Sequence, residues 1–158
     1  QCHLREDKMN TKHTLGISGK VKFTLKKDDN ILARYEHKNR VVQSGIEVIM
    51  NRFIDCSGSF VDSMGVGIVG TPPDGNDTGL ISLVSSAPLA EHIITSSPPV
   101  GGAIEFRSAF DVFEEDTVLR ECGMFCGNTL FARSVFPQIN IEAGMLLDLN
   151  WVISFTSV

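Results

Sequence analysis

The sequence predicts a mainly β protein, namely one antiparallel β-sandwich domain of jelly-roll or Ig-like type with a single docked helix near residues 45–55. Several segments alternate between apolar and polar residues, which is the pattern of strands with one buried face. Turn signals recur every ~8–12 residues, as in sandwiches and barrels. Only one segment has apolar residues at helical spacing. We therefore expect residues 1–18 to form an N-terminal arm and residues 19–158 to form one domain.

The first strand pair is predicted near the N-terminus. Residues 19–26 alternate, with Val21, Phe23 and Leu25 on one face. The segment Asp28-Asp29-Asn30 follows as a turn, because short polar side chains tolerate left-handed backbone. Residues 31–42 then return as a second strand, so the two runs predict a β-hairpin.

The helix is predicted from a capping box and from spacing. Ser44 precedes Glu47 by three residues, the arrangement in which each side chain caps a free backbone N–H. Ile46, Ile49, Met50 and Phe53 then recur at helical intervals. We expect a helix over residues 45–55, which the turn at residues 56–59 ends.

The middle of the chain is predicted to alternate short strands with loops. Residues 64–70 are apolar and glycine-rich, which is typical of a buried strand approached closely by other backbone. Residues 71–79 form a loop by composition, residues 89–95 a strand, and residues 96–102 another loop.

Four strands are expected in the C-terminal third. Residues 104–112 and 147–156 alternate regularly, and residues 119–125 and 130–136 form a pair joined by the turn Cys126-Gly127-Asn128. Trp151 lies on the apolar face of the last strand and is expected in the core.

Charge and composition exclude several classes of function. The formal net charge is −5, whereas non-specific nucleic-acid binding needs a basic surface. No apolar run approaches the ~20 residues that span a bilayer. The chain has four cysteines, whose spacing does not form a disulfide framework, so free thiols in a reducing cytoplasm are expected: Cys2, Cys56, Cys122 and Cys126.

No catalytic motif occurs. The four histidines (His3, His13, His37 and His92) have no partner at catalytic spacing, and no nucleophile elbow, P-loop or dinucleotide fingerprint is present. The acidic run Glu114-Glu115-Asp116 is predicted to be an exposed hairpin tip rather than an acid–base pair. We expect a protein that is not an enzyme, with no catalytic, cofactor-binding or metal-binding residues.

Two patterns suggest a metal site only weakly. Cys122 and Cys126 have a zinc-like spacing but no second ligand pair. Asp74, Asn76 and Gly79 match the first half of a calcium loop, but Ser85 stands where the bidentate glutamate belongs. A solvated turn is the preferred interpretation of that loop.

A basic stripe lies on the outer face of the first predicted strand, formed by Lys20, Lys22, Lys26 and Lys27. One interpretation is contact with an acidic partner surface. The preferred one is protection of an edge strand, since lysine opposes edge-to-edge pairing.

Three C-terminal segments carry a resemblance. They have the forms E-x-G-hydrophobic-F at residues 121–125, L-x-A-R-x-x-F at residues 130–136, and hydrophobic-x-x-x-W-x-I-x-F at residues 147–155. Upstream, residues 64–71 resemble an IG-x-G-T strand, Asp77-Thr78-Gly79-Leu80 has the form D-T-x-L, and residues 38–45 resemble N-x-V-T-x-x-G. Taken in this order, the segments resemble virion proteins of tailed bacteriophages, of the tail-fibre-like or minor tail kind.

The resemblance implies a scaffold rather than chemistry. It implies a non-enzymatic virion protein, assembled in the host bacterial cytoplasm, with tail, adaptor or major capsid proteins as partners and no nucleic acid or membrane. Attachment in the tail or a tail appendage is the first expectation, and capsid decoration is the alternative. A carbohydrate-binding module using the loop at residues 71–79 is a further alternative. A homo-oligomer is expected because virion positions are symmetric, and a trimer is our prediction.

Overall fold

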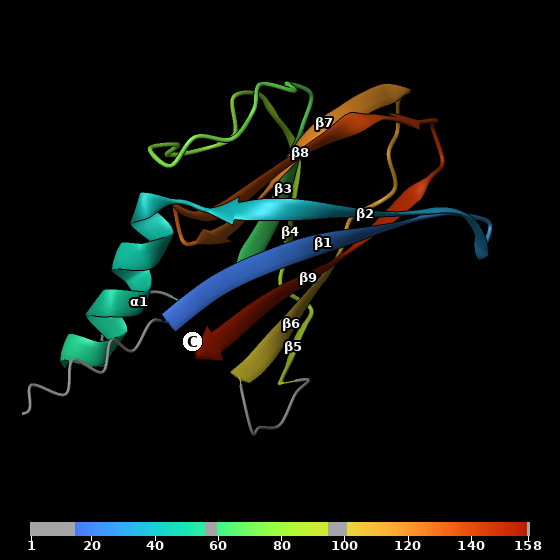
Figure 1. Cartoon of the computed structure of the whole chain (residues 1–158). Coiled ribbons are helices and arrows are strands. Elements are labelled where there is room, and N and C mark those ends of the chain that lie inside the picture. The colour runs from blue at the N-terminus through green and yellow to red at the C-terminus, as the bar shows by residue number, and fades with distance from the viewer. Residues whose placement is uncertain (1–14, 56–59, 95–100, 158) are drawn as a thin grey trace, which may run out of the picture.

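The computed structural model describes residues 15–55, 60–94 and 101–157, which contain nine strands and one helix (Figure 1). Residues 1–14 of the expected arm at residues 1–18, the turn at residues 56–59 and most of the loop at residues 96–102 lie outside the described residues. The elements are β1 Leu15–Lys27, β2 Asn30–Val41, α1 Gln43–Asp55, β3 Ser63–Gly67, β4 Leu83–Pro88, β5 Glu91–Ile94, β6 Gly101–Ala109, β7 Thr117–Cys126, β8 Thr129–Ile141 and β9 Leu146–Ser157.

All nine strands belong to one antiparallel sheet, in the order β4-β3-β7-β8-β2-β1-β9-β6-β5. The sheet curls into a half-barrel. The mainly β class and the single helix are therefore confirmed, whereas a jelly-roll or Ig-like sandwich is not. In the described residues, the strand pairing that joins the two parts of the sheet is that of β2 with β8, through the pairs Arg40↔Arg133 and Val41↔Ala132.

The predicted hairpin of β1 and β2 is confirmed. Asp28 and Asp29 have φ angles of 49° and 63°, the left-handed conformation that a tight hairpin turn requires. β1 begins at Leu15, which pairs with Ser157 of β9. Residues 15–18 are thus part of the sheet, and the boundary of the arm at residue 18 was wrong.

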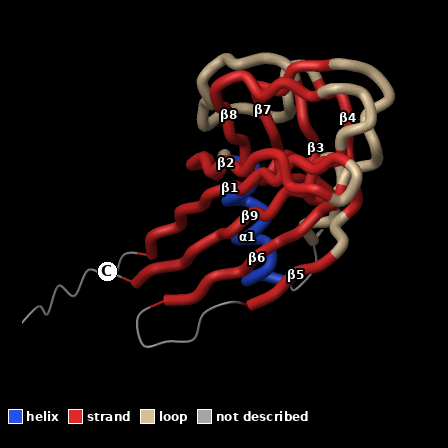
Figure 2. The backbone as a smooth tube through the Cα atoms, turned by 90° about the vertical axis from the view of Figure 1, so that its right-hand side faces the viewer, coloured by secondary structure: helices blue, strands red, loops and turns tan. Residues whose placement is uncertain are grey.

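The core lies on the concave side of the curled sheet. Both parts of the sheet contribute alternate apolar side chains, including the predicted Trp151, which is fully buried. Figure 2 shows β1, β9, β6 and β5 running side by side. Val48 and Ile49 of α1 pack against this core and complete it at one end.

The helix is confirmed, but its predicted capping box is not. α1 begins at Gln43, so Ser44 lies in its first turn, and Ile46 N donates to Val42 O at 3.1 Å. The Ser44 hydroxyl donates instead to the carbonyl of Leu130 in β8, at 2.6 Å. A buried backbone acceptor of the sheet has displaced the local cap.

The structure differs from the sequence prediction at one strand and at one turn. β4 was not predicted, because its sequence of Leu, Val, Ser, Ser, Ala and Pro does not alternate. The acidic run Glu114-Glu115-Asp116 is exposed, as predicted, but it is not a hairpin tip. It connects β6 to β7, which lie in different parts of the sheet and do not pair.

Candidate functional site

A long loop, residues 68–82, crosses the outer face of β3, β7 and β8. Gly65, Gly67 and Gly123 face it, and their lack of side chains lets its backbone come close. A Cβ atom on Gly67 would lie 2.4 Å from the carbonyl oxygen of Ser82. Because no side chain fits in that space, the three glycines permit the loop to cover the sheet.

Two buried charged side chains lie beneath this loop, Arg133 of β8 and Glu121 of β7, and the partly exposed Asp77 of the loop joins them. Arg133 Nε donates to Glu121 Oε2 at 2.9 Å, and Arg133 Nη1 donates to Asp77 Oδ2 at 2.9 Å. The side chains of Arg133 and Glu121 are 1% and 0% exposed. We call this group the ion cluster.

The ion cluster also binds loop backbone. The Glu121 carboxylate accepts the N–H of Ser82 at 3.0 Å and that of Ile81 at 3.3 Å, and Asp77 Oδ2 accepts the N–H of Asp74 at 2.9 Å. A buried carboxylate needs such partners to offset its lost hydration. The cluster therefore holds the loop on the sheet. Its hydrogen bonds account for the buried charges, so no catalytic role is needed to explain them.

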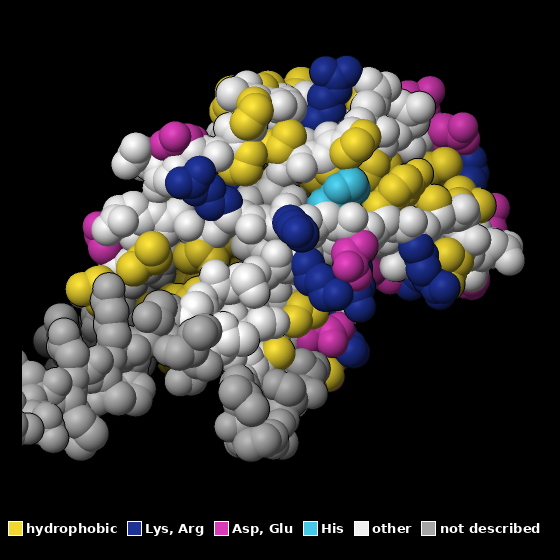
Figure 3. All heavy atoms as spheres, in the orientation of Figure 1, with side chains coloured by type: hydrophobic (Ala, Val, Ile, Leu, Met, Phe, Trp, Pro, Cys, Tyr) yellow, Lys and Arg dark blue, Asp and Glu magenta, His cyan; other side chains and the backbone are white. Residues whose placement is uncertain are grey.

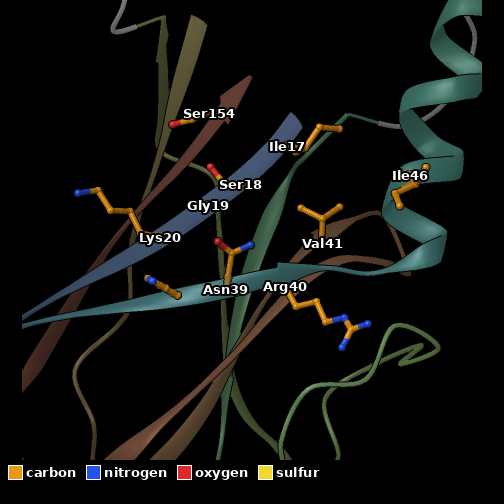
Figure 4. Close-up of a pocket in the computed structure, with 10 residues that line it drawn as sticks. Ile17, Ser18, Gly19, Lys20, Asn39, Arg40, Val41, Ile46 and Ser154 are labelled. Atoms are coloured by element: carbon orange, nitrogen blue, oxygen red, sulfur yellow. The ribbon is translucent and has the colours of Figure 1, made fainter. Parts of the chain in front are cut away.

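A second feature is a fork between β1 and β2. The two strands pair from the hairpin turn to Gly19↔Asn39 and then separate, because β2 turns away to join β8. Residues 15–18 of β1 continue to pair with β9. Their other edge faces no strand within the part of the chain that the structure describes. A hollow of about 900 Å³ opens at this place (Figure 4); we call it the fork pocket.

The fork pocket has an apolar side and a polar side. Ile17, Val41 and Ile46 contribute the apolar side chains. Asn39 projects into the space beside Gly19, where a Cβ atom would lie only 2.2 Å from Asn39 Oδ1 (Figure 4). In the part of the chain that the structure describes, both polar atoms of the Asn39 carboxamide are buried and have no hydrogen-bond partner, which is costly.

Three cationic side chains line the fork pocket. Lys20 Nζ lies 3.2 Å from the Glu36 carboxylate, and Arg40 Nη1 donates to the carbonyl of Pro73 at 3.5 Å. The third is Lys38 of β2, which pairs with Lys20 of β1. Figure 3 shows Lys and Arg side chains with a few acidic ones among them across this face of β1 and β2. The described residues that line the pocket include no acidic side chain.

The calcium-like loop uses its own oxygens internally. Asp74 Oδ1 accepts both the backbone N–H and the side-chain amide of Asn76, at 2.8 and 3.0 Å. These hydrogen bonds, led by the backbone one, lower the pKa of Asp74. Asp77 is committed to Arg133. Among residues 15–55, 60–94 and 101–157, no group of three or more His, Cys, Asp and Glu side chains could hold a metal ion.

The cysteine pair of β7 lies in the core. Cys122 and Cys126 are both buried free thiols. Burial raises the pKa of Cys122 well above its ordinary value and that of Cys126 to about 11. Protonated buried thiols are poor nucleophiles and poor metal ligands. Cys2 and Cys56 lie outside the described residues.

The preferred interpretation of the lysine stripe was wrong. β1 is a central strand between β2 and β9, so Lys20, Lys22, Lys26 and Lys27 do not protect an edge. They form ion pairs with neighbouring elements, such as Lys26 with Asp148 of β9 and Lys27 with Glu142. Contact with an acidic partner remains the open interpretation for Lys20, which also lines the fork pocket.

The sequence prediction missed both the ion cluster and the fork pocket. Signals for the cluster were present, since Asp77, Glu121 and Arg133 are the charged residues of the D-T-x-L, E-x-G and L-x-A-R patterns. No local pattern indicated the fork, because it depends on which strand β2 leaves and which it joins.

The chain has no match among known proteins that would name its function. No protein-family model matches it, and neither a curated protein nor a solved structure does. In the described residues, no helix is long and apolar enough to cross a membrane. Its own residues are therefore the basis for any functional proposal.

Proposed function

We propose that this chain is a non-enzymatic structural protein of a tailed-bacteriophage particle, located in the tail or a tail appendage. The observation that carries the proposal is the ion cluster. Asp77, Glu121 and Arg133 come from three segments that resemble phage virion proteins, and they meet in one group whose centre, Glu121 and Arg133, is buried. These residues bind one another and loop backbone, so their role in this chain is structural, as the resemblance to a virion scaffold implies.

An exposed apolar surface along β4 also supports assembly. Ile81, Leu83, Val84 and Val112 are 56%, 55%, 43% and 49% exposed, and Val84 and Val112 border the same hollow. We call this the β4 surface. β4 is an edge strand of the sheet. Apolar side chains gathered at a sheet edge are typical of protein–protein contact.

The partners in this proposal are other virion proteins and further copies of the chain. Copies in a virion are related by symmetry, and a trimer is the proposed oligomer. Each copy would present its curled sheet as a sandwich-like module whose second layer includes the loop over β3, β7 and β8. Trp151 is buried and the loop at residues 71–79 is held by Arg133, so neither offers the exposed aromatic surface typical of sugar binding.

Immunogold labelling of intact phage particles tests the location. An antibody to this chain is expected to label the tail or its appendages, with pre-immune serum as the control. Label spread over the head would replace the tail assignment with capsid decoration. Particles without label, from a preparation in which the antibody detects the purified chain, would refute a virion role.

A pair of variants tests the β4 surface. Leu83→Asp is expected to lower the mass of the oligomer measured by light scattering, because it places a charge in an apolar contact. Leu32→Asp is the matched control, since Leu32 is 50% exposed on β2, away from this surface. Equal effects of both variants, or none from Leu83→Asp, would contradict the assignment of the β4 surface to assembly.

A further inference from the structure

We infer that the fork pocket is a docking site for an extended, acidic segment of a partner protein, which adds as a strand beside residues 15–18 of β1. The inference deepens the proposed function, which would make the partner another virion protein. The docking chemistry itself depends only on the pocket and can be tested without particles.

The first reason is the free edge of β1. Within residues 15–55, 60–94 and 101–157, residues 15–18 pair with β9 alone, because β2 leaves β1 after the pair Gly19↔Asn39. A strand edge offers backbone N–H and C=O groups to an added strand. Four residues at ~3.3 Å each are enough for a segment of about four residues to pair.

The second reason is Asn39. Its carboxamide has one donor group and one acceptor, as a peptide group does, and both polar atoms are buried without a partner among the residues that the structure describes. The side chain lies where the two strands separate (Figure 4). Because both atoms are covered and Asn39 Oδ1 lies against Gly19, the carboxamide must turn away from Gly19 before the backbone N–H and C=O of an added strand can satisfy it.

The third reason is charge and shape. Lys20, Lys38 and Arg40 line the pocket, and among the described residues no acidic side chain does. Ile17, Val41 and Ile46 provide an apolar side. Because successive side chains of a strand point to opposite faces, a segment that alternates acidic and apolar residues fits both sides at once.

A peptide titration followed by NMR tests the inference on the full chain. The probe is the capped peptide Val-Asp-Val-Glu-Val-Thr, added to ¹⁵N-labelled protein at up to millimolar concentration. The amide signals of Ile17, Ser18 and Asn39 are expected to shift in a saturable way. The same peptide with Asn and Gln in place of its acids should bind at least fivefold more weakly, and a version with N-methylated backbone should not bind.

A matched pair of lysine variants tests the location. Lys20→Glu is expected to weaken binding of the acidic peptide by at least fivefold, whereas Lys22→Glu should leave it unchanged. The two lysines share a strand, are 47% and 50% exposed in their side chains, and both contact Glu36. Only Lys20 lines the fork pocket.

Four outcomes would overturn the inference. They are the absence of shifts at millimolar peptide, equal binding of the neutral peptide, equal loss in both lysine variants, and shifts of the same amides with protein concentration alone. The last result would identify a second copy of the chain as the occupant. None of these results bears on where the protein lies in a particle, so failure of the docking site and failure of the virion proposal can be told apart.

Discussion

Arg133 Nε donates a 2.9 Å hydrogen bond to Glu121 Oε2, and both side chains are excluded from solvent. The two residues are diagonal neighbours on adjacent strands, because Arg133 of β8 pairs directly with Gly123 and Glu121 of β7 pairs directly with Val135. Both project to the outer face, under the loop that Asp77 belongs to. The pair therefore links the two strands of a hairpin to a loop from an earlier part of the chain.

Removing the arginine of this pair should destabilise the fold strongly. Arg133→Met would leave Glu121 as a buried, uncompensated anion, so we expect the free energy of unfolding to fall by about 3–5 kcal/mol. Adding Glu121→Gln should recover about 1–3 kcal/mol, because the buried charge is gone while an acceptor for loop N–H groups remains. Urea unfolding at pH 7 measures both. A double variant less stable than Arg133→Met alone would contradict this role.

A methyl group at Gly45 should push α1 away from the sheet. Its Cβ would lie 2.1 Å from the carbonyl oxygen of Phe131, so Gly45→Ala is expected to lower stability by about 1–3 kcal/mol despite the better helix propensity of alanine. Gly79→Ala is the control, because its Cβ would meet no atom within 4 Å. It should be neutral or slightly stabilising. Thermal unfolding compares the two, and equal melting temperatures would argue against close contact of α1 with β8.

The two core thiols should be protected from alkylation. Burial raises the pKa of Cys126 to about 11 and that of Cys122 well above its ordinary value of 9.0. We expect iodoacetamide at pH 8 to leave both unmodified in the native protein and to modify both in urea. Peptide mapping by mass spectrometry counts them separately from Cys2 and Cys56.

The same pKa shift predicts a loss of stability in alkali. The unfolded thiol ionises near pH 9, while native Cys126 stays protonated until about pH 11. The folded state therefore binds more protons over this interval, and the free energy of unfolding should fall as the pH rises through it. A Cys126→Ala variant should show a smaller fall, measured by urea unfolding at each pH. An identical fall in both proteins would refute the assignment to Cys126.

His37 should resist protonation. Its ring stacks on Phe136, with centroids 5.4 Å apart, and meets the edge of Phe23, and this burial lowers its pKa from 6.5. The neutral His37 ring makes its full contribution to the free energy of unfolding above pH 6.5. This contribution is lost as the pH falls from 6.5 through the lower pKa of the folded state, because the unfolded chain binds its proton first. NMR titration of the His37 ring should give a midpoint below 6.5. A midpoint at or above that value would contradict the prediction.

The sequence by itself determined the local structure of most of the chain. Alternation in residues 19–26 and 147–156 predicted β1 and β9 because a strand repeats every two residues, whatever its neighbours are. The hairpin turn at Asp28 and the core position of Trp151 followed from equally local properties. β4 was missed because its sequence carries no such period.

Only the tertiary structure decided which strands are neighbours, and both sites depend on that. The local period of a strand does not say which strand lies next to it. The sequence therefore did not indicate that Lys20 lies on a central strand or that β6 and β7 do not pair. The fork pocket forms because β2 stops pairing with β1 after Asn39 and pairs with β8 from Arg40. The ion cluster likewise forms because the sheet and loop bring Asp77, Glu121 and Arg133 together in a space where a buried charge is stable only beside its partners.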